Sequence, residues 1–296
     1  MKNSFQISTE SSDLLKIVNK DHQLNAIINL SEGGRLQEWT SCNNLIIGEP
    51  SDSTYSESYA GALLFPFVNR LEHGVFTDQD IAYQWPLNDQ GRHAIHGLIF
   101  DKRFNFKTSH ADEFCAKVVL EYRYKGDMNG FPFPFIIEVV YRFFKDGLRL
   151  DLTVINCGSR PFPFNLGWHP YFFTSNINQT KISMPRDKNI EINRQLIPQS
   201  MTTVEAVFSN FIGTDHYDHC YRVQPAEVSC QTPAMQFVLT SSSPQTFIQI
   251  YTPKDPNYVA IEPMTSPGNS FNNNIGLLKL SPNESFHLNW NIQINS

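Results

Sequence analysis

The stretch FIIEVVYRFFKDGLRLDLTVIN, residues 135–156, decides how this chain folds. An apolar residue occupies every second position from 137 to 143 and again from 148 to 154. Such alternation is typical of β-strands with one buried face. Between the two halves lies Asp146-Gly147, a dipeptide that favours hairpin turns because both residues tolerate a positive φ. The stretch therefore predicts two long antiparallel strands.

The same period of two recurs along the chain. Residues 113–125 alternate, with an apolar face that we expect to begin at Phe114, and residues 286–292 alternate again. Aromatic residues make up 13% of the chain and suit pleated, half-buried surfaces, whereas no segment of 12 or more residues has helical apolar spacing. No repeat or low-complexity linker divides the chain. We predict an all-β fold, a large antiparallel β-sandwich, with residues 1–296 forming a single domain.

The composition excludes several classes of function. The 23 Lys and Arg against 29 Asp and Glu give a formal net charge of −6, and no basic run occurs, so we expect no nucleic-acid partner. We also expect no membrane association, because no stretch approaches a membrane span and the N-terminal residues lack an apolar signal segment. The five cysteines are scattered, which favours reduced thiols and a cytoplasmic location. A monomer or dimer is the default expectation.

Motifs for nucleotides and for serine nucleophiles are missing. The chain contains no G-x-x-x-x-G-K-[ST], no G-x-G-x-x-G and no G-x-S-x-G. We therefore expect no cofactor. One metal hypothesis remains open: His93 and His96 form an H-x-x-H pair, and so do His216 and His219, beside Cys220. Residues i and i+3 of a strand point to opposite faces, so each pair would need a turn to converge on one ion, and we predict no metal site.

Five polar segments place ionisable groups among aromatic and turn residues. A carbohydrate could bind there by stacking and hydrogen bonding. Together the segments supply two carboxylates, two imidazoles and a guanidinium. They are residues 61–70 (GALLFPFVNR), 96–98 (HGL), 165–172 (NLGWHPYF), 217–221 (YDHCY) and 259–267 (VAIEPMTSP).

These segments resemble those of the aldose 1-epimerases, or mutarotases, in the family's order. Arg70 lies in a stretch like the family's x-N-R-I, and His96 in its H-G step. His169 matches the histidine of N-x-x-x-H-x-Y-F, and Asp218 matches the aspartate of D-H-x-F, with a tyrosine in place of the phenylalanine. Glu262 lies in the late apolar-E-P/T strand. The family's fold is a large β-sandwich, in agreement with the strand pattern. Two departures, Leu98 after His96-Gly97 and Pro170 after His169, indicate a divergent subgroup.

The resemblance implies roles for seven residues. Glu262 would be the base that takes the proton from the sugar's O1, and His169 the acid that protonates the ring oxygen O5. His169 would then have to be substantially protonated near neutral pH, and Arg70 would help to keep Glu262 ionised. The substrate-binding residues would be Arg70, His96, Asp218, Asn69 and Trp168. Two positions are open for Trp168: its side chain would offer an aromatic face to the sugar, or it would point into the core.

Two alternatives to a free-hexose epimerase stay open. The first is a hexose 6-phosphate epimerase, which needs extra cations for the phosphate. Arg92 and Lys102 lie near His96 in sequence, and Arg160 and Arg186 lie nearer His169. The second is a non-catalytic carbohydrate-binding module on the same fold. The sequence does not reveal which hexose is preferred. Hexoses can differ by the inversion of a single hydroxyl group, and the side chains that would distinguish them cannot be placed from the sequence.

Overall fold

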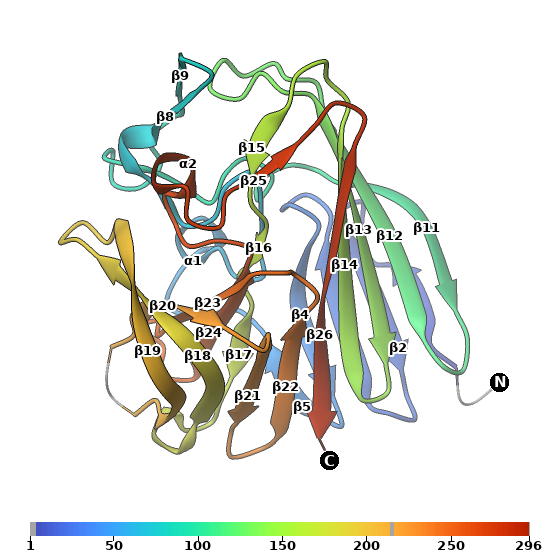
Figure 1. Ribbon diagram of the computed structural model, residues 1–296. Coiled ribbons are helices and arrows are strands. Elements are labelled where there is room, and N and C mark those ends of the chain that lie inside the picture. Colours follow the sequence, from blue (N-terminus) through green and yellow to red (C-terminus); the bar gives the residue numbers. More distant parts are fainter. Residues whose placement is uncertain (1–3, 214–215, 296) are drawn as a thin grey trace.

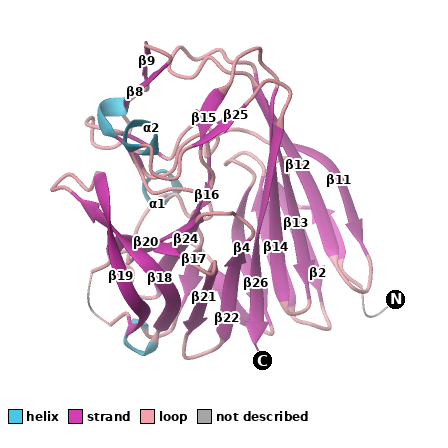
Figure 2. Cartoon of the chain, viewed as in Figure 1, coloured by secondary structure: helices cyan, strands magenta, loops and turns pink. Residues whose placement is uncertain are grey.

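A computed structural model describes residues 4–213 and 216–295. Twenty strands are linked by antiparallel hydrogen bonding into one sheet that folds over on itself as two layers (Figure 1). Within the described residues, the helices are α1 (Tyr55–Ser58), α2 (Ser270–Asn273) and two 3-10 turns, Glu72–Gly74 and Ile177–Gln179 (Figure 2). The expected large antiparallel β-sandwich is confirmed.

The first layer, called layer A, contains the long hairpins that the alternating sequence predicts. Its strands, in pairing order, are β11 (Asn105–Ala111), β12 (Ala116–Tyr124), β13 (Phe135–Phe144), β14 (Gly147–Asn156), β26 (Ser285–Asn295), β22 (Gln236–Ser241) and β21 (Glu227–Gln231).

The second layer, called layer B, carries two of the candidate site residues considered below, Glu262 on β24 and Asp218 on β20. Its strands, in pairing order, are β1 (Gln6–Thr9), β2 (Leu14–Asn19), β3 (Leu24–Asn29), β4 (Arg35–Ser41), β5 (Asn44–Ile47), β17 (Tyr171–Phe173), β24 (Tyr258–Met264), β23 (Thr246–Tyr251) and β20 (Asp218–Val223). Two short strands, β16 (Gly167–Trp168) and β6 (Leu63–Leu64), extend it beside β24.

The two layers are joined through one strand. β18 (Lys181–Ile192) pairs with β21 of layer A through residues 181–183 and with β20 of layer B through residues 186–189. It also pairs with β19 (Pro198–Phe211) to form a long hairpin. Three small two-stranded sheets complete the chain: β7 (Arg70–Leu71) with β10 (Ala94–Ile95), β8 (Val75–Asp78) with β9 (Ile81–Gln84), and β15 (Phe162–Phe164) with β25 (Leu278–Leu280).

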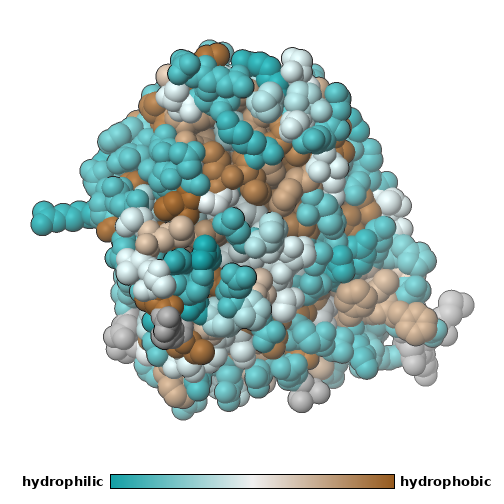
Figure 3. Space-filling view, in the orientation of Figure 1, coloured by the Kyte–Doolittle hydropathy of each residue, from teal (hydrophilic) through white to brown (hydrophobic). Residues whose placement is uncertain are grey.

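Aromatic pairs bridge the layers in the core. Phe172 of layer B stacks on Phe237 of layer A with ring centroids 4.3 Å apart, and Trp39 meets Phe143 edge-on at 6.4 Å. The rings are all buried. Aromatic residues bury large areas, so the many phenylalanines of the sequence contribute much of the core. Figure 3 shows a mostly hydrophilic outer face, with hydrophobic side chains gathered in a hollow near β15 and β25.

The predicted hairpin forms, with a shift of one residue in its turn. Phe144 pairs with Gly147, so the turn residues are Lys145 and Asp146, and neither Asp146 nor Gly147 has a positive φ. Glycine is required at 147 for another reason: a Cβ there would lie 2.5 Å from the carbonyl oxygen of Ile292 on β26. Phe114 is a second correction, because it precedes β12 and is 72% exposed. Within the described residues, no helix is long and apolar enough to cross a membrane.

Candidate active site

Alternation along β24 turns Glu262 away from the core between the layers. Val259 and Ile261 belong to the main core, whereas Ala260 and Met264 belong to small clusters on the opposite face. Glu262 shares that opposite face because its position has the same parity. The strand therefore presents a carboxyl group on the outer face of layer B, where it is only 2% exposed.

His169 follows β16 and reaches the same face. Its backbone is held from both sides, since its N–H donates to Ala62 O at 2.9 Å and its carbonyl accepts from Gly61 N at 2.8 Å. Its ring stacks on Tyr171 with centroids 5.1 Å apart, and the Tyr171 hydroxyl donates to Ser58 O at 3.2 Å. The imidazole Nε2 lies 3.4 Å from Glu262 Oε1. A carboxyl group and an imidazole thus lie side by side on the outer face of layer B.

Trp168 is not brought into this site. Being adjacent to His169 in an extended segment, it points to the opposite side, where it is fully buried and stacks on Trp290 of layer A at 6.5 Å. It does not line the cavity described below. The expectation of an aromatic face for the sugar is therefore corrected: Trp168 is a core residue.

Arg70 and Asn69 stand on the opposite wall, on a turn that places Asn69 at φ 50°. The Arg70 guanidinium donates through Nε to Asp89 Oδ2 at 2.8 Å, and its backbone N–H donates to Asn69 Oδ1 at 2.7 Å. β7 pairs with β10 in the register Arg70–Ile95, and the N–H of His96 donates to Asn69 O at 3.0 Å. Pairing of two short strands therefore brings the sequence-distant Arg70 and His96 together.

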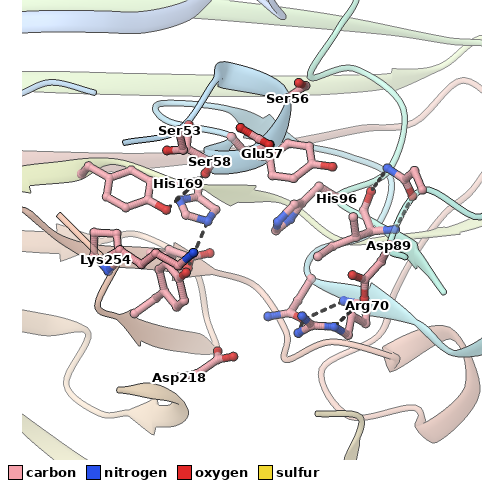
Figure 4. Close-up of a pocket in the computed structure, with 18 of the residues that line it drawn as sticks. Ser53, Ser56, Glu57, Ser58, Arg70, Asp89, His96, His169, Asp218 and Lys254 are labelled. Carbon is pink, nitrogen blue, oxygen red and sulfur yellow. Dashed lines mark hydrogen bonds and ion pairs between the residues drawn. The ribbon is translucent and has the colours of Figure 1, made fainter. Parts of the chain in front are cut away.

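His96 lies at the centre of the cavity in Figure 4. Its backbone has φ 64°, an unusual value for a residue with a Cβ. Its ring contacts Tyr59 edge-on at 4.6 Å and His169 edge-on at 5.4 Å. A strained backbone at a functional position is a recurrent feature of binding sites. The turn thus aims the imidazole at the acid–base pair.

Gly97, which follows His96, allows this turn. It has φ 76°, and a Cβ would lie 2.3 Å from Phe65 O. We expect Gly97→Ala to destabilise the fold by about 3 kcal/mol, from left-handed strain and overpacking together. Gly91→Ala is the matched control, because Gly91 has φ 69° but no atom within 4 Å of its Cβ position. Urea unfolding measures both variants, and equal losses would show that the contact with Phe65 does not matter.

Asp218 begins β20 and completes the set of predicted polar residues. Gln249 on the neighbouring β23 donates through Nε2 to Asp218 Oδ1 at 2.6 Å, and Gln249 pairs in turn with Glu262 on β24. Three adjacent strands thus present an aspartate, an amide and a glutamate on one face. Figure 4 shows Asp218 on the side of the cavity opposite the α1 segment.

The cavity bounded by these residues has a volume of about 610 Å³. Its walls contain six of the seven predicted site residues, all except Trp168. The lining is more acidic than basic. The carboxyl groups belong to Asp52, Glu57, Asp89, Asp218 and Glu262, and the cations to Arg70 and Lys254.

Burial controls the proton affinities of the central pair. It raises the pKa of the Glu262 carboxyl well above its usual range; the Asp218 carboxylate acts in the same direction and Arg70 in the opposite one. Burial lowers the pKa of His169 to about 4. The expectation that His169 is substantially protonated near neutral pH is therefore wrong for the free protein. The pair favours its uncharged form, with the proton on Glu262.

A raised carboxyl pKa makes a prediction about stability. The folded state binds the Glu262 proton more tightly than the unfolded state, so the free energy of unfolding falls as pH rises from the ordinary glutamate range through the raised pKa. Glu262→Gln removes this titration. We expect the variant to melt above wild type at pH 8, with a smaller gap at pH 5. Each tenfold change in proton affinity is worth about 1.4 kcal/mol, or about 2–4 °C in Tm. Calorimetry at both pH values tests this, and a gap that is the same at both contradicts it.

The histidine pairs considered for metal binding do not form a cluster. His93 is buried and its Nδ1 accepts from the N–H of His73 at 3.1 Å, whereas His96 faces the cavity. His219 and Cys220 are neighbours on β20 and point to opposite faces. Within residues 4–213 and 216–295, no three His, Cys, Asp or Glu side chains lie close enough together to hold a metal ion.

The structure adds four lining residues, and one residue that holds the side chain of Asp218, to which the sequence assigned no role. Tyr171 has a sequence signal, because it lies two positions after His169 and so shares its face. Gln249 has none, since it reaches the site only through cross-strand pairing. The same holds for three residues contributed by loops and α1: Tyr59, Asp89 and Lys254.

Taken together, the fold and cavity define a β-sandwich protein with a polar pocket built around a buried carboxyl–imidazole pair. The chain belongs to the aldose 1-epimerase family, whose model matches residues 13–293. The family expected from the motifs is thus confirmed. Among curated relatives, the uncharacterized protein YihR of Escherichia coli K12 is 26% identical over 275 residues, which cover 88% of this chain and 87% of YihR.

Solved structures share the fold. A galactose mutarotase-like protein from Clostridium acetobutylicum superposes with a TM-score of 0.86 at 19% identity, covering 99% of this chain and 98% of the other. Galactose 1-epimerase from Lactobacillus acidophilus NCFM superposes with a TM-score of 0.81 at 17% identity, covering 100% and 99%. At these identities the likeness concerns architecture.

Proposed function

We propose that this protein is an aldose 1-epimerase that interconverts the α and β anomers of a free hexose by opening and reclosing the sugar ring. The observation that carries the proposal is the contact between His169 Nε2 and Glu262 Oε1 at 3.4 Å within a polar cavity. Ring opening must remove a proton from O1 and add one to O5. A base and an acid held side by side can serve the two oxygens of one hemiacetal.

The reaction balances with these two groups alone. Ionised Glu262 takes the O1 proton while protonated His169 gives a proton to O5, and the C1–O5 bond breaks to give the open aldehyde. Rotation about C1–C2 presents the other face of the carbonyl. Reclosure reverses both transfers, so the pair returns to its starting form. No bond to the protein is formed.

The pKa values of Glu262 and His169 are compatible with a mechanism in which the two residues together hold one proton. The uncharged pair, with the proton on Glu262, is the form that ring opening leaves behind. The charged pair, which acts on the closed sugar, holds the same single proton on His169. Activity should therefore extend over the pH range in which the pair holds one proton, from about 4, where burial has placed the pKa of His169, up to the raised pKa of Glu262. Their mutual attraction helps to form the charged pair when the sugar excludes water.

The other polar residues would hold the sugar hydroxyls. Arg70 supplies a guanidinium fixed by Asp89, and Asp218 supplies a carboxylate fixed by Gln249. Asn69 and His96 line the same cavity, with the His96 ring next to that of His169. Donors and acceptors fixed by neighbouring groups lose little conformational entropy on binding.

The hexose 6-phosphate alternative has little support in the lining. None of Arg92, Lys102, Arg160 and Arg186 lines this cavity, and its carboxylates outnumber its cations. A phosphate would meet repulsion from most of this wall. A binding module would not require a carboxyl group beside an imidazole, so the contact between Glu262 and His169 supports an epimerase over a binding module.

The proposal is tested by anomer exchange with freshly dissolved α-glucose and α-galactose, followed by polarimetry or magnetisation-transfer NMR. We expect wild-type protein to accelerate at least one of the two sugars in proportion to its concentration. Binding of a sugar without acceleration would instead favour the binding module. Acceleration restricted to glucose 6-phosphate would favour the phosphate alternative.

A further inference from the structure

Asp89 is the counterion of Arg70 in the wall of the candidate active site (Figure 4). The two side chains meet at 2.8 Å and are only 18% (Arg70) and 16% (Asp89) exposed. Both residues line the cavity. Charges that are largely withdrawn from water are screened weakly by salt, so each continues to act on its neighbours. The ion pair therefore couples the loop that carries Asp89 to the groups inside the cavity.

The loop of Asp89 is fastened to the segment that follows Arg70. Asp89 and His93 form an isolated antiparallel bridge, in which the N–H of Asp89 donates to His93 O at 3.0 Å. His93 is buried, and its Nδ1 accepts from the N–H of His73 at 3.1 Å. His73 belongs to the 3-10 turn directly after β7. The first histidine of the H-x-x-H pair thus serves to join these two segments.

The other end of the loop is fixed to the partner strand of Arg70. The Asn88 side chain accepts from Ile95 N at 2.8 Å and donates to Ile95 O at 3.1 Å. Ile95 on β10 is paired with Arg70 on β7. Asp89 therefore lies between two anchor points, both tied to the strand that carries its counterion. A carboxylate held in this way loses little conformational entropy when it binds the guanidinium.

The charge of Arg70 acts on Glu262. It favours the ionised carboxylate and so opposes burial and the charge of Asp218, which together raise the pKa of Glu262 well above its usual range. The other titratable groups around Glu262 come from four elements, and burial favours their uncharged forms near neutral pH. They are His169 after β16, Tyr171 on β17, Cys220 on β20 and Tyr251 on β23. The remaining charged groups of the wall are Asp52, Glu57, Asp89 and Lys254.

A carboxylate beside the guanidinium weakens this action of Arg70. At Glu262 the potentials of Arg70 and Asp89 have opposite signs and partly cancel. If Asp89 were neutral, the charge of Arg70 would act in full, and the pKa of Glu262 would fall toward its ordinary range. The negative charge of Asp89 therefore helps to keep the proton on Glu262.

We propose that Asp89 is a positioning residue that holds the Arg70 guanidinium in the cavity wall and offsets the influence of its charge on Glu262. Asp89 acts through Arg70 and not on the sugar itself. Its consequence for catalysis rests on the proposed function, whereas its effect on Glu262 does not. The two parts can be separated, because the hydrogen bond sets where the guanidinium lies and the charge sets the proton affinity of Glu262.

The charge effect is measured without a substrate. Carbon-13 NMR of protein labelled at the glutamate carboxyl carbons follows the titration of Glu262, whose resonance is identified by its absence in Glu262→Gln. We expect Asp89→Asn to lower the pKa of Glu262 by about 0.5–1 pH units, the order of magnitude for one unit charge across a solvated cavity. Asp52→Asn is the matched control, because it makes the same substitution at an exposed position of the same wall. An unchanged pKa in Asp89→Asn, or an equal fall in both variants, overturns the charge effect.

Kinetics then separate the hydrogen bond from the charge. Asparagine can still accept from Arg70 Nε, so Asp89→Asn should keep KM within about threefold of wild type. Its fall in kcat/KM at alkaline pH should move to lower pH by as much as the pKa of Glu262 does. Asp89→Ala also loses the acceptor, and its KM should rise about tenfold.

A role limited to loop structure gives a different result. Loosening of the loop would lower the melting temperature and raise KM in both variants while leaving the pH profile in place, and that outcome rejects the proposal. If wild-type protein does not accelerate anomer exchange, the proposed function fails. The NMR titration would still decide whether Asp89 acts on Glu262.

Discussion

Glu262→Gln is expected to lower kcat for anomer exchange by about 10³-fold while the protein remains folded. Positioned acid–base groups contribute about 10²- to 10⁴-fold. Glutamine preserves the size of the side chain and its capacity to accept a hydrogen bond, but it cannot take the O1 proton. Because the substitution changes no volume on the buried face of β24, the loss should appear in kcat, with KM changed little.

The matched control for this loss is Glu57→Gln. Glu57 lines the same cavity, but it is exposed and its carboxylate accepts from Thr54 N at 2.9 Å and from Thr54 Oγ1 at 2.8 Å. We expect it to keep most of the activity. Polarimetry with the preferred sugar compares wild type and both variants at one pH. Wild-type kcat in Glu262→Gln would remove the base assignment, and equal losses in both variants would indicate a general electrostatic effect of the cavity.

Parts of this site could be predicted from the sequence because they are local. His169 and Glu262 occur in short motifs, and alternation within a strand determines which face each occupies. The expectation that Trp168 would offer a face to the sugar was wrong, because the same alternation turns the residue adjacent to His169 into the core. The hairpin of residues 135–156 could likewise be predicted from its alternation of apolar and polar residues. The need for glycine at position 147 could not, because it arises from contact with β26, more than a hundred residues away in sequence.

Other parts depend on contacts that no local pattern encodes. Asp89 holds the Arg70 guanidinium, and Gln249 holds Asp218 through pairing of β20 with β23. The proton affinities are equally non-local. A histidine beside a carboxylate suggests a raised pKa, but burial dominates here and lowers the pKa of His169 to about 4. Burial depends on the whole fold, so the charge state of the pair had to come from the structure.

His169→Asn is expected to lower kcat by about 10²- to 10³-fold, because O5 then departs without a positioned proton donor. His96→Asn is the matched comparison, since the same substitution is made in the same cavity at a residue proposed to bind hydroxyls. We expect its main effect to be on KM. A normal kcat in His169→Asn, or a loss seen only in KM, rejects the acid assignment.

The pH profile of His169→Asn separates a chemical role from a structural one. In the proposed mechanism the wild-type pair acts while it holds one proton, so kcat/KM should fall as pH rises through the raised pKa of Glu262. Without His169, the remaining catalyst is Glu262 alone, and it acts only when ionised. The residual activity should therefore increase with pH over the same range in which wild-type activity decreases. If the substitution only disturbed the packing near Tyr171, the activity of the variant would still decrease with rising pH, as in wild type. The sign of the change of kcat/KM with pH therefore decides whether His169 and Glu262 share a proton during catalysis.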